Sequence, residues 1–217
     1  MHIFLVDDHP MTVDGFQSIL LKDKMFVNPT FTSALDATTA YQKIQIAVSE
    51  NRKFDVAILD YSIPPDPENN IFFGSDLVLL LQKIMPNCKT IMVTAHTEKI
   101  VVYNIAKKIN PNGFLIKNDV TPENLIKAVS IVISNQEYRS PMVLKCITEM
   151  LENNMMMDDV NRQILTYMSK GYKIKDLEAV LHISKSAIEK RVSKLKDTFD
   201  VKDDNSLLQQ VIFKGFI

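Results

Sequence analysis

The sequence predicts an α/β fold, a doubly wound parallel sheet, followed by a small all-α domain. Short apolar segments alternate with longer amphipathic segments over residues 1–134. This alternation is typical of a parallel sheet covered by helices on both faces. Residues 158–217 contain helical patterns but no strand pattern. The change predicts a second, helical domain.

Each expected strand is a short apolar run, which is typical of a strand buried on both faces. The strands are expected at 2–6, 54–60, 89–94 and 113–117, with a weaker one near 26–32. Helices are expected at 11–22, 36–50, 74–85, 97–108 and 121–134. Thr121 and Pro122 suit the N-cap and the first turn of the last of these helices.

A helix-turn-helix pattern follows a linker. We expect residues 135–157 to form a linker around one helix at about 141–151, and then helices at about 159–170, 173–181, 184–199 and 204–213. Gly171 is placed to end the first of these four helices, and Ser184 suits the N-cap of the third. The second and third helices flank a short turn at 181–184, which predicts a helix-turn-helix domain.

The composition is that of an ordinary globular protein, with 217 residues and a net charge of −1. Residues 1–130 carry a net charge of −2 and residues 158–217 one of +2, so any basic surface must be local. No apolar run approaches the roughly 20 residues of a membrane helix. We expect a cytoplasmic protein without a signal peptide. Cys88 and Cys146 lack metal-ligand spacing and are expected to be reduced thiols.

Polar residues of a specific chemistry lie at the ends of four predicted strands. Asp7 and Asp8 follow the first strand, and Asp60 ends the second, FDVAILD. Thr94 and Lys117 end the next two. Because the carboxyl ends of parallel strands meet at one edge of a sheet, three carboxylates, one hydroxyl and one ammonium should converge. Each residue alone has an ordinary alternative, such as a solvated turn, a surface lysine or a capping hydroxyl, but their joint occurrence favours a site.

This cluster suits a divalent cation and phosphoryl transfer. Three neighbouring carboxylates need a counter-charge, and Mg²⁺ takes one or two carboxylates, a carbonyl and waters. A carboxylate beside Mg²⁺ can accept a phosphoryl group. Lys117 would help to neutralise the phosphoryl oxygens, and Thr94 would hydrogen-bond to one of them.

The segment at 61–73 is a long connection beside this edge. It contains Pro64, Pro65 and Pro67, which predict an extended path without a helix. Loops of this length beside a site are often lids. The alternative is a surface insertion without a function.

Residues 1–130 resemble the receiver domain of two-component response regulators. Asp7 and Asp8 match its acidic pair, Asp60 its phosphoacceptor, Thr94–Ala95 its hydroxyl residue and small neighbour, and Lys117 its lysine. The resemblance implies a five-stranded flavodoxin-like sheet. It also implies that Asp60 is phosphorylated with the participation of Thr94 and Lys117.

The same resemblance implies a metal site and a switch. The Mg²⁺ ligands are expected to be Asp7, Asp8, Asp60 and the backbone carbonyl of Ser62. Phe114 stands three residues before Lys117, at the aromatic position that acts with Thr94 as the switch. Asn118 departs from the proline of many receivers, and the proline-rich segment after Asp60 is a second departure.

Residues 158–217 resemble a LuxR-type (NarL/FixJ-like) output domain. Gly171 precedes the expected scaffold helix, and Ile183–Ser184 open the expected recognition helix, in which an apolar stripe recurs at Ile188, Val192, Leu195 and Phe199. The resemblance implies that the other faces of this helix contact DNA. They carry Lys185, Ser186, Glu189, Lys190, Arg191, Ser193 and Lys194. Ala187, Glu189 and Arg191 replace the family's usual Thr, Lys and His.

Together the two resemblances predict a response regulator and not an enzyme. A sensor histidine kinase would phosphorylate Asp60, and the protein would regulate transcription by binding promoter DNA as a homodimer. Glu189 and the small basic surplus leave open a regulator that binds a protein instead of DNA, or one that is not phosphorylated. A phosphohydrolase is a third possibility, but such enzymes usually carry a second aspartate where this chain has Ser62.

Overall fold

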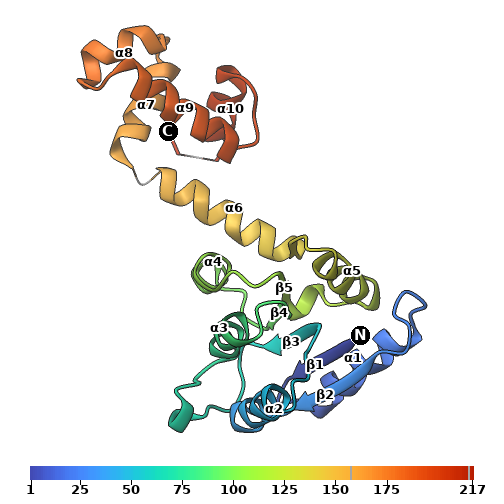
Figure 1. Ribbon diagram of the computed structural model, residues 1–217. Coiled ribbons are helices and arrows are strands. Elements are labelled where there is room, and N and C mark those ends of the chain that lie inside the picture. Colours follow the sequence, from blue (N-terminus) through green and yellow to red (C-terminus); the bar gives the residue numbers. More distant parts are fainter. Residues whose placement is uncertain (157, 215) are drawn as a thin grey trace. The chain divides into compact units, whose positions relative to one another are not determined.

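The first unit is built on a six-stranded parallel sheet (Figure 1). The computed structural model describes residues 1–156, 158–214 and 216–217, apart from the side chains of Ile100 and Met156. The strands are β1 (His2–Val6), β2 (Thr30–Ala34), β3 (Val56–Asp60), β4 (Lys89–Thr94), β5 (Gly113–Ile116) and β6 (Tyr138–Arg139). Their order is β2-β1-β3-β4-β5-β6. The first five strands have the flavodoxin-like order, whose ligand crevice lies outside the carboxyl ends of β1 and β3.

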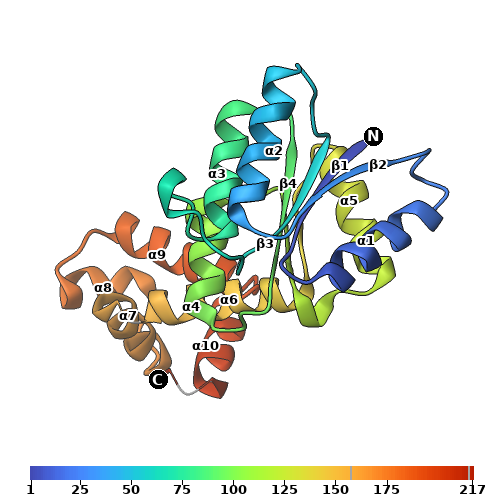
Figure 2. The ribbon, with the colours of Figure 1, turned by 90° about the horizontal axis from the view of Figure 1, so that it is seen from below.

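Helices cover both faces of the sheet (Figure 2). On one face pack α1 (Pro10–Lys22) and α5 (Pro122–Ile133), which bury Leu20 and Val129 against it. The other face carries α2 (Ala37–Ser49), α3 (Gly74–Ile84), α4 (Lys99–Asn104) and the first part of α6 (Pro141–Met156). Alternate residues of each central strand enter the two cores, as the twofold period of a strand requires. The predicted doubly wound fold is confirmed.

The sixth strand is a correction to the five that were predicted. β6 has only two residues, which pair with Gly113 and Phe114 of β5. A strand this short has no periodic pattern in the sequence. The Arg139 guanidinium binds it in place by donating to the carbonyl of Asn112 at 3.1 Å and to the side chain of Asn110 at 2.9 Å.

Two elements of the first unit begin or continue differently from the prediction. The strand expected near 26–32 starts only at Thr30, because Asn28 has a left-handed backbone (φ 45°) and Pro29 follows it. The helix expected at 97–108 is α4 followed by η2 (Ile105–Ile109), a π-helical turn. The left-handed Asn110 ends it.

The proline-rich loop is also different from the prediction of an extended path without a helix. Pro67–Asn69 form a 3₁₀ turn, η1, and Asp66 caps it by accepting from the amide of Asn69. Proline is favoured in the first turn of a helix, so Pro67 starts the turn instead of preventing it. Asp66 and Ile71 form an antiparallel bridge that closes the loop. The loop is therefore folded and anchored.

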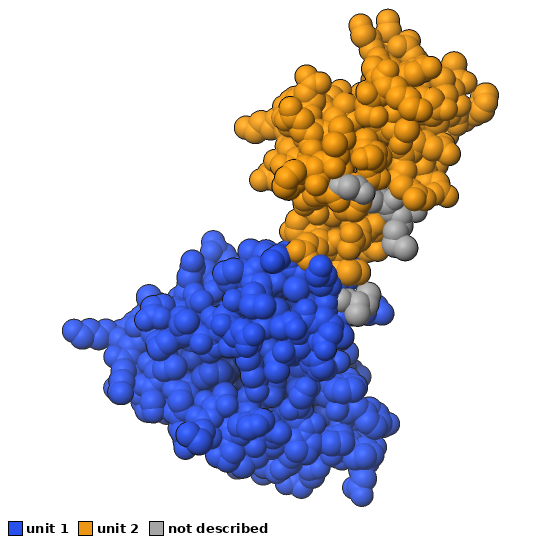
Figure 3. All heavy atoms as spheres, turned by 180° about the vertical axis from the view of Figure 1, so that it is seen from behind, with its two compact units in different colours: residues 1–147 blue, residues 148–217 orange. Residues whose placement is uncertain are grey.

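The chain divides into two units, Met1–Ile147 and Thr148–Ile217 (Figure 3). The predicted linker, 135–157, is distributed between them. β6 belongs to the sheet of the first unit, and Val143 and Cys146 of α6 are buried in its core. The helix is longer than predicted and continues to Met156. Met157, the last residue of the predicted linker, lies outside the described residues.

The second unit is helical. Its helices after α6 are α7 (Asp159–Ser169), α8 (Ile174–Leu181), α9 (Lys185–Thr198) and α10 (Asp204–Phe213), close to the predicted bounds. Gly171 follows α7 with φ 90°, and Ser184 caps α9 by accepting from the amide of Ala187, as predicted. The predicted stripe of α9 is buried. Among the described residues, no helix is long and apolar enough to cross a membrane.

Candidate functional site

Lys117 holds two carboxylates together at the carboxyl edge of the sheet. Its Nζ donates to Oδ2 of Asp60 at 2.9 Å and to Oδ2 of Asp7 at 3.1 Å. Asp60 is the last residue of β3, Asp7 follows β1, and Lys117 follows β5. The parallel arrangement brings these three strand ends to one edge, as predicted from the sequence. The ammonium lies between two carboxylates and reduces their mutual repulsion.

Asp60 is nearly buried, with a side chain that is 4% exposed. Burial raises the pKa of its carboxyl and the negative charge of Asp7 adds to the rise, whereas the hydrogen bond and charge of Lys117 and, more weakly, the backbone of Ser62 oppose it. In the described part of the chain, no group donates a hydrogen bond to Asp60 Oδ1. A buried carboxylate oxygen without a donor is costly, so this atom is suited to bind a further group.

The pKa of Lys117 is raised as well, but for a lysine a raised pKa favours the charged form. Burial disfavours its ammonium, but the hydrogen bonds and charges of Asp60 and Asp7 outweigh burial and raise the pKa of Lys117. The two residues differ because Lys117 has two anionic neighbours, whereas Asp60 has one cation and one like charge. Lys117 is therefore a permanent cation at physiological pH.

His9 is a member of the site that the sequence analysis did not identify. Its Nδ1 lies 2.7 Å from Oδ1 of Asp8 and 3.2 Å from Oδ1 of Asp7. One ligand atom from each of these three residues falls within a group of 4.8 Å, the size of a metal-binding set. Asp60 is outside that group and reaches Asp7 through Lys117. Ser62 is exposed, two residues after the end of β3.

The two expected switch residues are both fully buried. Thr94 ends β4, and its Oγ1 accepts a hydrogen bond from the amide of His96 at 3.1 Å. Phe114 of β5 lies in the core beside the α2–α3 face of the sheet. The ring of His96 stands edge-on to Tyr61, and Tyr61 stacks on Phe73 at the end of the proline-rich loop. This aromatic row connects the loop after Asp60 with the loop after Thr94.

Gly74 is a second residue of the site that sequence reasoning did not single out. A Cβ on this residue would lie 1.8 Å from the carbonyl oxygen of Asp60. The amide of Gly74 donates to the carbonyl of Tyr61 at 2.9 Å. Only glycine lets the start of α3 approach the Asp60 backbone so closely. Its place at the end of the long loop was the available signal in the sequence.

The exposed face of α9 is less basic than its sequence suggests. Lys185, Ser186, Glu189, Lys190, Ser193 and Lys194 are all exposed. Lys185 pairs with Glu189 at 3.6 Å. The Nη1 of Arg191 donates to Oδ2 of Asp158 and to Oδ1 of Asn161, both at 2.8 Å. Arg191 therefore joins α9 to the start of α7, whereas Lys185, Lys190 and Lys194 are exposed on the outer face.

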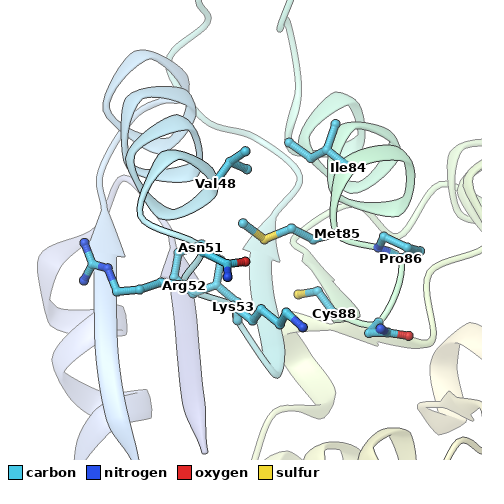
Figure 4. A pocket seen from close by; sticks show the side chains of 10 residues that line it. Val48, Asn51, Arg52, Lys53, Ile84, Met85, Pro86 and Cys88 are labelled. Carbon is cyan, nitrogen blue, oxygen red and sulfur yellow. The ribbon is translucent and has the colours of Figure 1, made fainter.

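A pocket lies away from this site, at the amino ends of β3 and β4 (Figure 4). Its lining includes Lys53, Met85 and Cys88. Burial raises the pKa of the Cys88 thiol to about 12, so that thiol is protonated and unreactive. None of the predicted site residues lines this pocket.

Comparisons with known proteins agree with the geometry. Residues 3–130 match the response regulator receiver domain family. Two relatives are the oxygen regulatory protein NreC of Staphylococcus haemolyticus, 26% identical, and that of Staphylococcus epidermidis, 27% identical. In both cases all of this chain and 99% of the relative are covered.

Solved structures show the same fold. The response regulator RcsB of Salmonella typhimurium is 18% identical with a TM-score of 0.60, over 97% of both chains. RcsB in a complex with DNA is 18% identical with a TM-score of 0.58, over 96% of both chains. Because the receiver match spans more than half of the sequence, the chain belongs to the response regulator receiver domain family, and its receiver domain is followed by a helical unit.

Proposed function

We propose that Asp60 accepts a phosphoryl group from a sensor histidine kinase. The observation that carries this proposal is the state of the Asp60 carboxylate. One of its oxygens is bound to Lys117 at 2.9 Å, and the other, Oδ1, has no donor within the described residues. A carboxylate that is fixed in place and has one free oxygen is a suitable nucleophile for phosphorus.

Transfer of the phosphoryl group replaces a phosphorus–nitrogen bond with a phosphorus–oxygen bond. An oxygen of Asp60 forms the new bond to phosphorus, the bond from phosphorus to the donor nitrogen breaks, and the imidazole of the kinase histidine keeps the electron pair. Lys117 is close enough to bind the phosphoryl oxygens, because it already contacts Asp60. Thr94 ends the neighbouring strand, and its hydroxyl can donate to the same group. Both residues act by positioning and charge, as phosphoryl transfer requires.

Mg²⁺ fits the donors at this edge. Asp7 and Asp8 provide carboxylate oxygens within the 4.8 Å group, and Lys117 connects the Asp60 carboxylate to Asp7. Hard oxygen donors are those that Mg²⁺ prefers. We infer that Asp7, Asp8, Asp60 and the Ser62 carbonyl hold it. The ion, when bound, supplies positive charge that neutralises phosphoryl oxygens.

We also propose that residues 158–217 bind DNA through α9. This helix follows the tight turn after α8, and Lys185, Lys190 and Lys194 are exposed on it. A response regulator of similar fold, RcsB, has been solved with DNA. Ser186, Glu189 and Ser193 lie on the same exposed face and are available for base edges. Arg191 contacts a phosphate only if it leaves Asp158.

The test of the phosphorylation proposal uses a small acyl phosphate and Mg²⁺. We expect the intact wild-type chain to gain the mass of one phosphoryl group, and hydroxylamine to remove it. Asp60→Asn should gain none. Asp55→Asn is the control, because Asp55 is an exposed aspartate at the other end of the same strand. Equal labelling of wild type and Asp60→Asn would show that the acceptor is another residue.

A further inference from the structure

The first turn of α6 is fastened to the turn that carries Lys117. Residues Lys117–Asp119 form η3, a single 3₁₀ turn. Oδ2 of Asp119 accepts a hydrogen bond from the amide of Met142, the second residue of α6, at 2.9 Å. The amide groups of a first helical turn lack partners within the helix. Asp119 therefore caps α6 from a distant segment, and Asn124 fixes the backbone of Asp119 by donating to its carbonyl at 2.8 Å.

The residue before α6 is bound to the strand that carries Phe114. Ser140 is fully buried, and its amide donates to the carbonyl of Phe114 at 2.9 Å. Its hydroxyl accepts from the amide of Ile116 at 3.4 Å. Ser140 occupies the usual N-cap position before Pro141, yet its hydroxyl faces β5. The external cap from Asp119 is thus the one that stabilises the second amide of the helix.

The same helix also contacts the segment that follows Thr94. The thiol of Cys146 lies 3.9 Å from the carbonyl of Thr97, in the loop between β4 and α4. Val143 and Cys146 are buried in the core that contains Phe114. One side of α6 therefore meets both the loop that follows Thr94 at the end of β4 and the turn that begins with Lys117. Beyond Ile147 the helix continues into the second unit.

From these contacts we propose that α6 is the element that reads the state of Asp60, and that phosphorylation weakens the Asp119–Met142 cap and loosens the first turns of α6. The inference rests on the proposed phosphorylation of Asp60. Lys117 now binds the carboxylates of Asp7 and Asp60 directly. A phosphoryl group on Asp60 adds oxygens between them, so Lys117 must move to bind these oxygens. Because Lys117 and Asp119 share a single turn, the displacement reaches the cap two residues later.

Hydrogen exchange of the full chain tests this coupling without any variant. Beryllofluoride with Mg²⁺ serves as the phosphoryl mimic, and the exchange of the amides of residues 142–147 is compared with and without it. We expect exchange to become about fivefold faster, the factor that the loss of one helix cap gives. Unchanged or slower exchange in protein that has bound the mimic would overturn the proposal.

The reciprocal effect gives a second measurement. Because coupling between two sites is reciprocal, Asp119→Ala should already show fast exchange in residues 142–147 and should bind beryllofluoride about fivefold more tightly. Asp119→Asn keeps an acceptor oxygen and should behave like the wild type. Asp203→Ala is the matched control, since Asp203 caps α10 of the second unit by accepting from the amide of Ser206.

The outcomes separate the two proposals. If the wild type binds no beryllofluoride and gains no phosphoryl mass, the proposed function itself fails. If it binds the mimic but Asp119→Ala binds it no more tightly than Asp203→Ala, only the role of α6 fails. If Asp119→Asn changes the amide exchange and the beryllofluoride affinity as much as Asp119→Ala does, the charge of the carboxylate causes the effect. The hydrogen bond to Met142 then does not couple α6 to Asp60.

Discussion

Asp60 carries a stability cost that depends on pH. Burial raises the pKa of its carboxyl above the ordinary value of 3.8. Because the folded-state pKa is raised, the stability that the protonated Asp60 carboxyl contributes is fully present below pH 3.8. That contribution is lost as the pH rises through the folded-state pKa. Asp60→Asn should therefore increase the free energy of unfolding of the first unit at pH 7 by about 1 kcal/mol, and the increase should vanish below pH 3.8. Calorimetry over a pH series measures it, with Asp14→Asn, at an exposed position of α1, as the control.

Arg191 and Lys190 are neighbours on α9 with separate roles. The hydrogen bond from Arg191 holds the pKa of the Asp158 carboxyl below its ordinary value. The stability that the Arg191–Asp158 pair contributes is fully present above pH 3.8, the ordinary pKa of an aspartate. It is lost as the pH falls through the lowered pKa of Asp158. Both side chains are more than a third exposed, so Arg191→Ala should cost only about 0.5 kcal/mol. Exchange of buried amides in α9 at pH 7 should become about twofold faster, and this effect should shrink as the pH falls through the lowered pKa of Asp158.

Lys190→Ala should leave that exchange unchanged, because Lys190 is exposed. It should instead lower the slope of log K against log salt for promoter DNA by about one unit, since one phosphate contact is lost. Fluorescence anisotropy over a salt series measures the slope. An unaltered slope and affinity would remove Lys190 from the DNA interface and favour a helical domain that binds a protein.

At the scale of elements, the start of α3 determines where Asp60 lies. A Cβ on Gly74 would meet the backbone of Asp60, which cannot turn aside as a side chain can. Gly74→Ala should destabilise the first unit by about 1–3 kcal/mol and slow the phosphorylation of Asp60, because the nucleophile is displaced. Thermal unfolding and the rate of labelling by an acyl phosphate measure the two effects.

Gly15→Ala is the matched control for Gly74→Ala. Gly15 lies within α1, and a Cβ there would meet nothing within 4 Å. Alanine favours a helix more than glycine does, so this substitution should stabilise by about 0.5–1 kcal/mol and leave the labelling rate unchanged. If both substitutions change the free energy of unfolding in the same direction, the close approach of α3 to Asp60 is not the reason for glycine at position 74.

At the scale of the whole molecule, we expect two chains on each operator. One recognition helix covers few base pairs, and a twofold pair of helices doubles the contacts. On α10, Leu207 and Val211 are buried in their own unit, whereas Ile212 and Phe213 are 53% and 87% exposed. Light scattering with promoter DNA should give two chains per duplex with beryllofluoride and fewer without it. Phe213→Glu should weaken the pair, and Leu21→Glu on α1 should not.

One chain per duplex under activating conditions would reject the dimer. If two chains bind each duplex equally well without beryllofluoride, the dimer is supported but phosphorylation is not what causes it to form.

The order of the elements and the strand ends that form the site can be read from the amino-acid pattern alone. Apolar runs located β1, β3, β4 and β5, and the parallel arrangement then required Asp7, Asp60 and Lys117 to meet. Local signals also located Thr121 and Ser184 as caps. These features could be predicted because each depends on periodicity or on groups a few residues apart.

The pairing of polar groups across the fold could not be read from the sequence. Asp119 meets Met142 across 23 positions, and Arg191 meets Asp158 across 33. The two-residue β6 exists because Gly113 and Phe114 of β5 offer it a partner. A hydrogen bond between distant segments depends on how complete helices and strands pack, and no pattern within a few residues contains that information. For this reason the strand-end cluster was predictable, whereas the attachment of α6 to it was not.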